Sequence, residues 1–368
     1  MARNVVVCCD GTANEFAADR TNVAKLCHAL VKDPERQLVY YHPGIGTMAP
    51  PGFGTGLGAW AARSAGAAFG YRLQEDIARA YAFIMNHWME GDRLFLFGFS
   101  RGAYTARVVA ALIHMYGLVM PGNEGLVPYL VRMLWKIHSI PHDGSAQAKK
   151  TNYFALAHQF KDSMAVAHCK PHFLGVWDTV SSVGWIGSPV ALPYTKDNPD
   201  VIATRHAVAI DERRAFFRTN LFSPDMHDLR EVWFPGVHCD VGGGYPERAS
   251  GLSKYALAWM ADEARHSGLL LDGRRLDVVL GIGDPEYAPR SPDARIHDSM
   301  TPRWRIAEFV PKRYWDKQRK EEIWRLNLFQ RRDMGKAPIV HDVAWQIPGA
   351  YADRLPADVV KLSTVWPT

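Results

Sequence analysis

One short stretch of this 368-residue chain constrains its fold more than any other. Four consecutive apolar residues at 94–97 are followed by Gly-Phe-Ser-Arg-Gly at 98–102, and helical spacing of apolar residues then runs from 101 to 116. A continuous apolar run of this length is typical of a strand buried on both faces, as in a parallel sheet covered by helices. The two glycines permit a tight turn from strand to helix, with Ser100 at its apex.

Strand and helix patterns alternate along the rest of the chain. The sequence predicts strands at 5–9, 37–41, 93–98, 173–177 and 232–234, and helices at 21–30, 71–88, 101–116 and 254–266. Such alternation is typical of a parallel, doubly wound sheet. We therefore expect an α/β fold with one catalytic domain over 1–290, a helical insertion at about 122–170, and a C-terminal segment at 291–368 that packs on this domain or extends it.

The turn at Ser100 predicts a nucleophile. A strand-to-helix turn exposes the serine hydroxyl, and the N-terminus of the next helix directs backbone N–H groups toward an anion beside it. We expect the oxyanion of an acyl-transfer reaction to be held by the Arg101 N–H and by the N–H of Gly11 or Thr12, in the loop after the first strand. Asp10 ends that strand, and it either supports this loop or caps the next segment.

A serine hydroxyl needs a base to remove its proton, and fifteen histidines compete for that role. His238 is favoured because it follows a predicted strand and precedes a glycine-rich stretch, which places it on a loop at the edge of the sheet. The acid that orients the base is expected at a strand end between the serine and the histidine, and Asp178 meets this condition. Asp240 is the alternative, although its place two residues from His238 suits support of its own loop.

Composition narrows the class of protein. Apolar residues make up 48% and charged residues 22%, as in ordinary globular domains. The five cysteines have no disulfide-framework spacing, which favours a reducing compartment. We see neither a signal peptide nor a run of roughly 20 apolar residues, so we expect a soluble chain that is cytoplasmic at synthesis. We expect no cofactor and no metal, since Cys169 and His172 alone do not make a metal site.

Positive charge is concentrated in one segment, 303–336, which begins at Arg303 and ends at Lys336. It contains eleven basic and five acidic residues with six aromatic residues between them, whereas the whole chain has a net charge of +5. Basic and aromatic residues together suit an anionic membrane surface, but a solvated helix with its rings docked on the core explains the pattern as well. Nucleic acid would fit the charge but not the motifs.

Several strings, in order along the chain, resemble one family. They are Cys-Asp-Gly-Thr at 9–12, Thr-Asn-Val at 21–23, Tyr-His-Pro-Gly-Ile-Gly-Thr at 41–47, Leu-Phe-Gly-Phe-Ser-Arg-Gly-Ala at 96–103, Gly-Val-Trp-Asp-Thr-Val at 175–180 and Val-His-Cys-Asp-Val-Gly-Gly-Gly-Tyr at 237–245. The chain resembles the bacterial family of uncharacterised α/β hydrolases that includes phospholipase effectors of the type VI secretion system.

This resemblance implies the α/β-hydrolase fold, a triad of Ser100, Asp178 and His238, and cleavage of phospholipid esters. It adds two open expectations, which are export through a type VI secretion system and an immunity protein as partner.

The combined expectation is a serine hydrolase that cleaves carboxylic esters through an acyl-enzyme, with phospholipid as the favoured substrate. An esterase for small soluble or polymeric esters is the enzymatic alternative. From a different class, the chain could be a non-catalytic module that binds a membrane surface or a partner protein and carries an unreactive serine turn.

Overall fold

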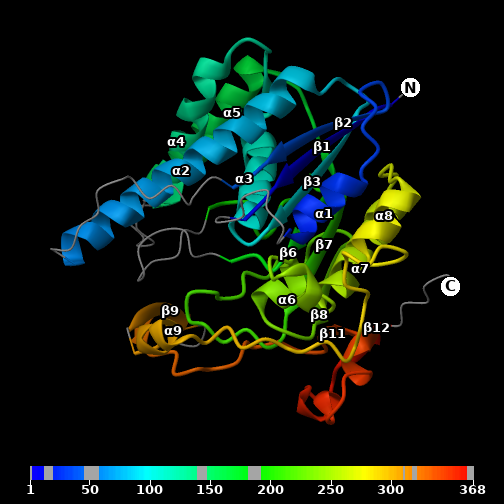
Figure 1. Cartoon of the computed structure of the whole chain (residues 1–368). Coiled ribbons are helices and arrows are strands. Elements are labelled where there is room, and N and C mark those ends of the chain that lie inside the picture. The colour runs from blue at the N-terminus through cyan, green and yellow to red at the C-terminus, as the bar shows by residue number, and fades with distance from the viewer. Residues whose placement is uncertain are drawn as a thin grey trace.

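The computed structural model describes residues 2–11, 20–44, 58–138, 147–180, 192–309, 311–316 and 321–362. Its centre is an eight-stranded sheet with the order β12-β11-β8-β7-β6-β3-β1-β2, and the neighbouring strands in it are parallel (Figure 1). The strands are β1 (Asn4–Cys9), β2 (Gln37–His42), β3 (Arg93–Phe99), β6 (Pro171–Trp177), β7 (Ala203–Ala209), β8 (Leu229–Phe234), β11 (Ile339–His341) and β12 (Val360–Leu362).

Helices cover both faces of the sheet, as Figure 1 shows. One face carries α2 (Gly58–His87), α3 (Arg101–Tyr116), α4 (Val127–His138) and α5 (Gln147–Met164), and the other carries α1 (Asn22–Ala29), α7 (Ser253–His266) and α8 (Gly273–Val279). In β1, alternate residues serve the two layers: Val5 and Val7 pack with α2 and α3, whereas Val6 and Cys8 pack with α1 and α7. The predicted α/β fold is confirmed.

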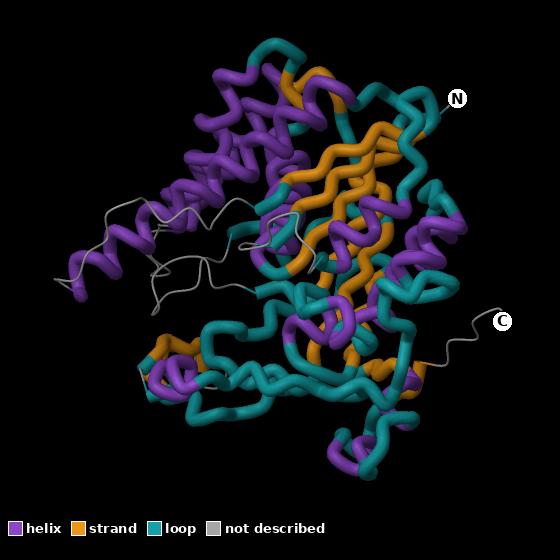
Figure 2. The backbone as a smooth tube through the Cα atoms, viewed as in Figure 1, coloured by secondary structure: helices purple, strands orange, loops and turns teal. Residues whose placement is uncertain are grey.

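The remaining elements are short and lie beside the sheet. β4 (Leu118–Val119) pairs with β5 (Ala165–Ala167), and β9 (Lys312–Asp316) pairs with β10 (Glu321–Arg325), both antiparallel. Figure 2 shows the β9–β10 pair apart from the central strands. α6 (His238–Gly242) follows β8, and α9 (Pro302–Ala307) precedes the β9–β10 hairpin.

The predicted helical insertion at 122–170 contains α4 and α5. Leu130 and Leu134 of α4 and Ala157 of α5 belong to the same apolar core as α2 and α3. The described part of the insertion is therefore a packed helical layer, and residues 139–146 lie outside the described residues. Within the described ranges, no helix has both the length and the apolar character needed to cross a bilayer.

The predicted strands and helices are present close to the predicted residues, except that α2 begins at Gly58 instead of residue 71. The sequence analysis does not predict β7, although all seven of its residues are buried. Arg205 and His206 interrupt its apolar pattern. Arg205 forms an ion pair with Glu263, and His206 Nδ1 lies 2.7 Å from Glu231 Oε2. These partners compensate for the burial of two polar side chains in a central strand.

Two glycines allow β1, β3 and α3 to approach one another closely. A Cβ atom at Gly98 would lie 2.4 Å from the Gly102 carbonyl oxygen, and a Cβ atom at Gly102 would lie 2.1 Å from the Cys9 carbonyl oxygen. Both obstructing atoms belong to the backbone of packed elements, so neither can move aside without displacing a strand or a helix.

We expect Gly102→Ala to lower the free energy of unfolding by about 3 kcal/mol or more, because the added methyl group overlaps the backbone of β1. Gly125→Ala is the matched control, since nothing lies within 4 Å of its Cβ position. Urea unfolding measures the difference between the two variants. Equal unfolding midpoints for wild type, G102A and G125A would show that this close approach does not constrain the turn.

Candidate active site

The register of the sheet brings two predicted site residues to the same edge. Phe99 at the end of β3 is the partner of Trp177 at the end of β6. Ser100 and Asp178 follow these residues directly, and the Ser100 N–H donates to the Trp177 carbonyl at 3.0 Å. The carboxyl edge of a parallel sheet is where ligands of open α/β folds bind, so the two residues lie where a site is expected.

Ser100 occupies a strained turn. Its φ of 58° and ψ of −118° lie in a region that residues other than glycine rarely adopt. The side chain is half-buried and does not cap α3, and within the described parts of the chain no hydrogen bond to its hydroxyl is recorded. The turn thus presents the hydroxyl at the N-terminus of a 16-residue helix, where the helix dipole favours negative charge.

Asp178 and His238 form a buried pair. His238 Nδ1 lies 2.5 Å from Asp178 Oδ2, and the two side chains are 5% and 1% exposed. The N–H of Ala209, at the end of β7, donates to Asp178 Oδ1 at 2.9 Å. When Nδ1 donates to the carboxylate, Nε2 is the imidazole nitrogen left to accept a proton, as a general base requires.

Aromatic packing fixes the imidazole beside the serine turn. The ring of Phe99, the residue before Ser100, lies 4.6 Å from the His238 ring, and Phe217 approaches edge-on at 4.8 Å. Gly242 of α6 makes room for Phe99, because a Cβ atom there would fall 1.8 Å from the phenyl ring. The two rings therefore set the position of His238 relative to the nucleophile turn.

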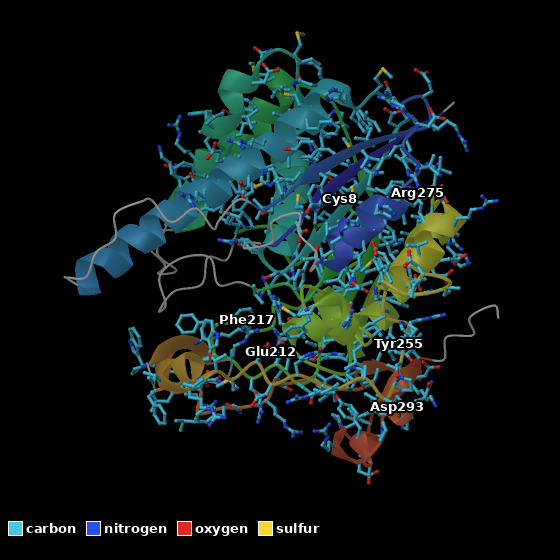
Figure 3. The ribbon with its side chains drawn as sticks, in the orientation of Figure 1. Cys8, Glu212, Phe217, Tyr255, Arg275 and Asp293 are labelled. Atoms are coloured by element: carbon cyan, nitrogen blue, oxygen red, sulfur yellow. The ribbon has the colours of Figure 1, made fainter. Side chains whose placement is uncertain are left out.

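Glu212, which the sequence analysis missed, is a second buried carboxylate at the site. Its carboxylate accepts a hydrogen bond from the backbone N–H of His238 at 3.3 Å. Arg214 donates to the same carboxylate from Nε at 3.0 Å and from Nη2 at 2.8 Å. The Arg214 guanidinium lies 3.5 Å from the centre of the Phe217 ring. Figure 3 labels Glu212 and Phe217, which lie near α6. Nothing in the sequence marks Glu212, because a run of charged residues at 211–214 is typical of a solvated surface.

Burial and charge act in opposite directions on these pKa values. Burial lowers the pKa of His238, although the hydrogen bond and charge of Asp178 and the charge of Glu212 act to raise it. Burial acts to raise the pKa of Asp178, but the Arg332 guanidinium and the His238 hydrogen bond outweigh it and hold this pKa well below its usual range. The pair is therefore a carboxylate and a neutral imidazole near neutral pH, which is the state of a general base before reaction.

The predicted oxyanion donors differ in their surroundings. Arg101 is the first residue of α3, where backbone N–H groups point out of the helix beside Ser100. The Gly11 N–H instead donates to Asp10 Oδ1 at 2.7 Å, and a carboxylate so close would repel an oxyanion. Thr12 lies outside the described residues. This arrangement favours Arg101 over Gly11.

Asp10 and Asp240 make local contacts. Asp10 Oδ2 accepts from Thr21, the N-cap residue of α1, at 2.6 Å and from the Tyr41 hydroxyl at 2.7 Å. Asp240 Oδ1 lies 2.6 Å from His297 Nδ1. Each carboxylate thus joins neighbouring segments.

Arg332 also reaches the site, and the sequence analysis missed it because it is one of eleven basic residues in the segment 303–336. Its Nη1 lies 2.5 Å from Asp178 Oδ1, and its Nη2 lies 3.0 Å from Asp178 Oδ2.

In the part of the chain that the structure describes, no group of three or more His, Cys, Asp or Glu side chains is arranged to hold a metal ion.

Comparison with known proteins identifies the family. The model described as "T6SS, Phospholipase effector Tle1-like, catalytic domain" matches residues 3–263, which contain Ser100, Asp178 and His238. The chain belongs to this family. The resemblance stated from the sequence is thereby confirmed, and the family is described as the catalytic domain of phospholipase effectors. Arg332 lies beyond the matched residues.

Individual relatives are more distant. "Uncharacterized protein YEL023C" from Saccharomyces cerevisiae is 34% identical over 233 residues, which are 60% of this chain and 33% of that protein, so the chain spans a third of the relative's length. A crystal structure of an uncharacterized protein from Pseudomonas aeruginosa has 19% identity and a TM-score of 0.46, over 79% of this chain and 49% of the other. A Tle1 effector bound to the VgrG spike of the type VI secretion system has 18% identity and a TM-score of 0.39, over 68% and 53%.

We expect the acid limb of kcat/KM to have its midpoint below pH 6.5, the ordinary pKa of histidine, because burial lowers the pKa of His238 and only the neutral imidazole acts as a base. Glu212→Gln should move the limb to still lower pH, since it removes a negative charge that raises this pKa. A pH series with a chromogenic ester measures both. A wild-type midpoint above pH 6.5, or an upward shift in E212Q, would contradict this account of the charges.

Proposed function

We propose that the chain is a serine hydrolase that cleaves carboxylic esters of phospholipids through an acyl-enzyme. The observation that carries the proposal is the buried pair of His238 and Asp178, held beside the strained turn that presents Ser100. The family supports the substrate class, since its description is that of a phospholipase catalytic domain.

In the proposed reaction, Ser100 Oγ attacks the ester carbonyl carbon while His238 Nε2 takes the hydroxyl proton. Asp178 keeps the Nδ1–H tautomer and stabilises the imidazolium that forms. When the tetrahedral intermediate collapses, the alcohol leaves with the proton from His238, and the acyl group stays on the serine. Water then attacks this acyl-enzyme, again giving its proton to His238, and the carboxylic acid leaves as the bond to Ser100 Oγ breaks and Oγ takes that proton from His238.

The oxyanion of each tetrahedral intermediate would be held at the N-terminus of α3. Arg101 N–H is the donor that the surroundings favour, and Gly11 or Thr12 would supply a second donor. Each donor of this kind contributes on the order of 3 kcal/mol to the transition state. Because these donors are backbone groups of a packed turn, they need no reorganisation during the reaction.

Residues 1–290 would form the catalytic domain, with the helical insertion at 122–170, and the segment 291–368 would complete it. β11 and β12 extend the sheet beside β8, which ties this last segment to the domain. The effector family supports export through a type VI secretion system as part of the proposal.

An anionic lipid surface is the partner that the segment 303–336 fits best. The segment contains most of the short helix α9 and the β9–β10 hairpin, and the ring of Trp304 docks against Phe216 and Phe217. Its most exposed apolar side chains, among the described residues, are Ile306 (72%), Phe309 (61%), Trp324 (60%) and Leu328 (53%). Arg305, Arg325 and Arg331 are exposed on the same segment. Exposed apolar side chains beside arginines suit the boundary between headgroups and acyl chains.

We expect Ser100→Ala to reduce fatty-acid release from phosphatidylethanolamine–phosphatidylglycerol vesicles by at least about 10⁴-fold, because the substitution removes the oxygen that attacks the ester. Ser223→Ala, a half-buried serine outside the site, should behave as wild type. Labelling of Ser100 by a fluorophosphonate is the second measurement. Labelling with hydrolysis of short-chain esters but not of vesicles would favour the small-ester esterase. No labelling and no hydrolysis by the wild type would overturn the triad.

We expect the double substitution Phe309→Ser and Trp324→Ser to weaken vesicle binding by about tenfold or more, because two exposed rings no longer enter the interface. Hydrolysis of a short-chain soluble ester should stay at the wild-type rate. Val166→Ser, which removes an apolar side chain that is 55% exposed elsewhere on the molecule, is the control. Unchanged co-sedimentation of the double variant with anionic vesicles would exclude this surface as the docking site.

A further inference from the structure

Both terminal nitrogens of the Arg332 guanidinium group are held by the elements that form the site. Besides its two bonds to Asp178, its Nη1 donates to the Ala209 carbonyl at 3.0 Å, and its Nη2 donates to the Phe217 carbonyl at 2.6 Å. The Arg332 side chain is 5% exposed. A fork of donors that matches both carboxylate oxygens gives geometric specificity that a single ammonium group does not.

The same carboxylate serves the imidazole. Asp178 Oδ2 accepts from His238 Nδ1 and from Arg332 Nη2, while Oδ1 accepts from the Ala209 N–H and from Arg332 Nη1. Four donors fix the plane of the carboxylate, and two of them come from Arg332. Without these two, the carboxylate would keep a single bond on each oxygen and could rotate about its Cβ–Cγ bond.

The rest of the C-terminal segment secures Arg332 in this place. The buried carboxylate of Glu308 accepts from the N–H of Ala215 at 2.7 Å, from the N–H of Phe329 at 3.0 Å and from the Asn327 side chain at 2.6 Å. Ser299 donates to Glu212 at 3.1 Å. The loop after β7, which borders His238, is thus fastened to the C-terminal segment at several points.

We propose that Arg332 is a positioning residue of the hydrolase: it fixes the Asp178 carboxylate in the orientation that His238 requires and sets the pH range in which His238 is a base. This inference rests on the proposed Ser100–His238–Asp178 mechanism. It assigns a working part of the site to a residue outside the region that the family model matches. Arg332 does not touch the reacting atoms, so it acts through Asp178.

The sign of the pH effect follows from the charges around the imidazole. Among the described residues, Asp178 after β6 and Glu212 and Arg214 in the loop after β7 act on His238, Cys239 and Asp240 follow it in α6, and Arg332 lies behind Asp178. Arg332 neutralises much of the charge that Asp178 presents to the imidazole. Removing the guanidinium strengthens the attraction between Asp178 and the imidazolium, so the pKa of His238 must rise and the acid limb must move to higher pH.

The decisive experiment compares Arg332→Gln and Arg332→Lys with Arg331→Gln, which removes an exposed arginine one residue away. The rate constant for modification by a fluorophosphonate is measured over about pH 5–9, the range in which histidine titrates. We expect R332Q to react about 10- to 100-fold more slowly than wild type, because Asp178 is no longer held in place. Its acid limb should move up by about one pH unit, which a general loss of stability would not cause.

R332K retains the positive charge but lacks the paired donors that match both carboxylate oxygens. We expect its acid limb to stay near that of the wild type, while its maximal rate lies between those of the wild type and R332Q. R331Q should match the wild type in both rate and limb. If R332Q does not fold, as judged by circular dichroism, R332K decides the question: a wild-type limb with a lowered rate supports the proposal, and a wild-type rate overturns it.

Two failures are distinguishable. A folded R332Q with an unmoved acid limb overturns the role of Arg332, while labelling of the wild type and its loss in S100A would still support the triad. An unlabelled wild type overturns the proposed function itself, before any arginine variant is compared.

Discussion

The buried negative charge of Asp178 is the interaction on which the rest of the site depends. A carboxylate with 1% exposure stays ionised only where donors and cations replace the water it has lost. Here they come from three separate parts of the chain, which are His238 in α6, the N–H of Ala209 at the end of β7, and Arg332 in the C-terminal segment. The geometry of the acid–base pair therefore depends both on the sheet from β6 to β8 and on the C-terminal segment.

Steric contact, not charge, fixes the nucleophile. The turn at Ser100 exists because Gly102 lies against the backbone of β1, where a side chain would not fit. Phe99 then transmits this placement to α6, since its ring fills the space that Gly242 leaves and lies against the His238 imidazole. A strained backbone at the serine is thus balanced by dense packing on both sides of it, as expected where surrounding structure over-determines a rare conformation.

The predicted residues depend on neighbours close in the chain, whereas the missed residues depend on partners far away in it. The turn at Ser100 is visible in the sequence because strand, glycines and helix are adjacent, and Asp178 and His238 are visible because each follows a strand. β7 is not predicted because Arg205 is hydrophilic and is therefore expected at the surface. Its ion-pair partner Glu263, which compensates for its burial, is 58 residues away in the chain. Arg332 escaped for the same reason: its contact with Asp178 spans 154 residues, and nothing local separates it from its basic neighbours.

Arg332, which orients Asp178, lies close in the chain to the exposed rings that would contact lipid. The exposed Phe329 precedes Arg332 by three residues, and an extended chain spans at most about 3.6 Å per residue. The exposed ring and the buried guanidinium can therefore move only a short distance relative to each other. The hydrogen bond from the backbone N–H of Phe329 to Glu308 restricts the movement of this stretch further. If the exposed rings of this segment rest on lipid, the surface that supplies the substrate also restrains the chain that aligns Asp178. A segment with these two roles would link docking to the geometry of the base without any hinge or large movement.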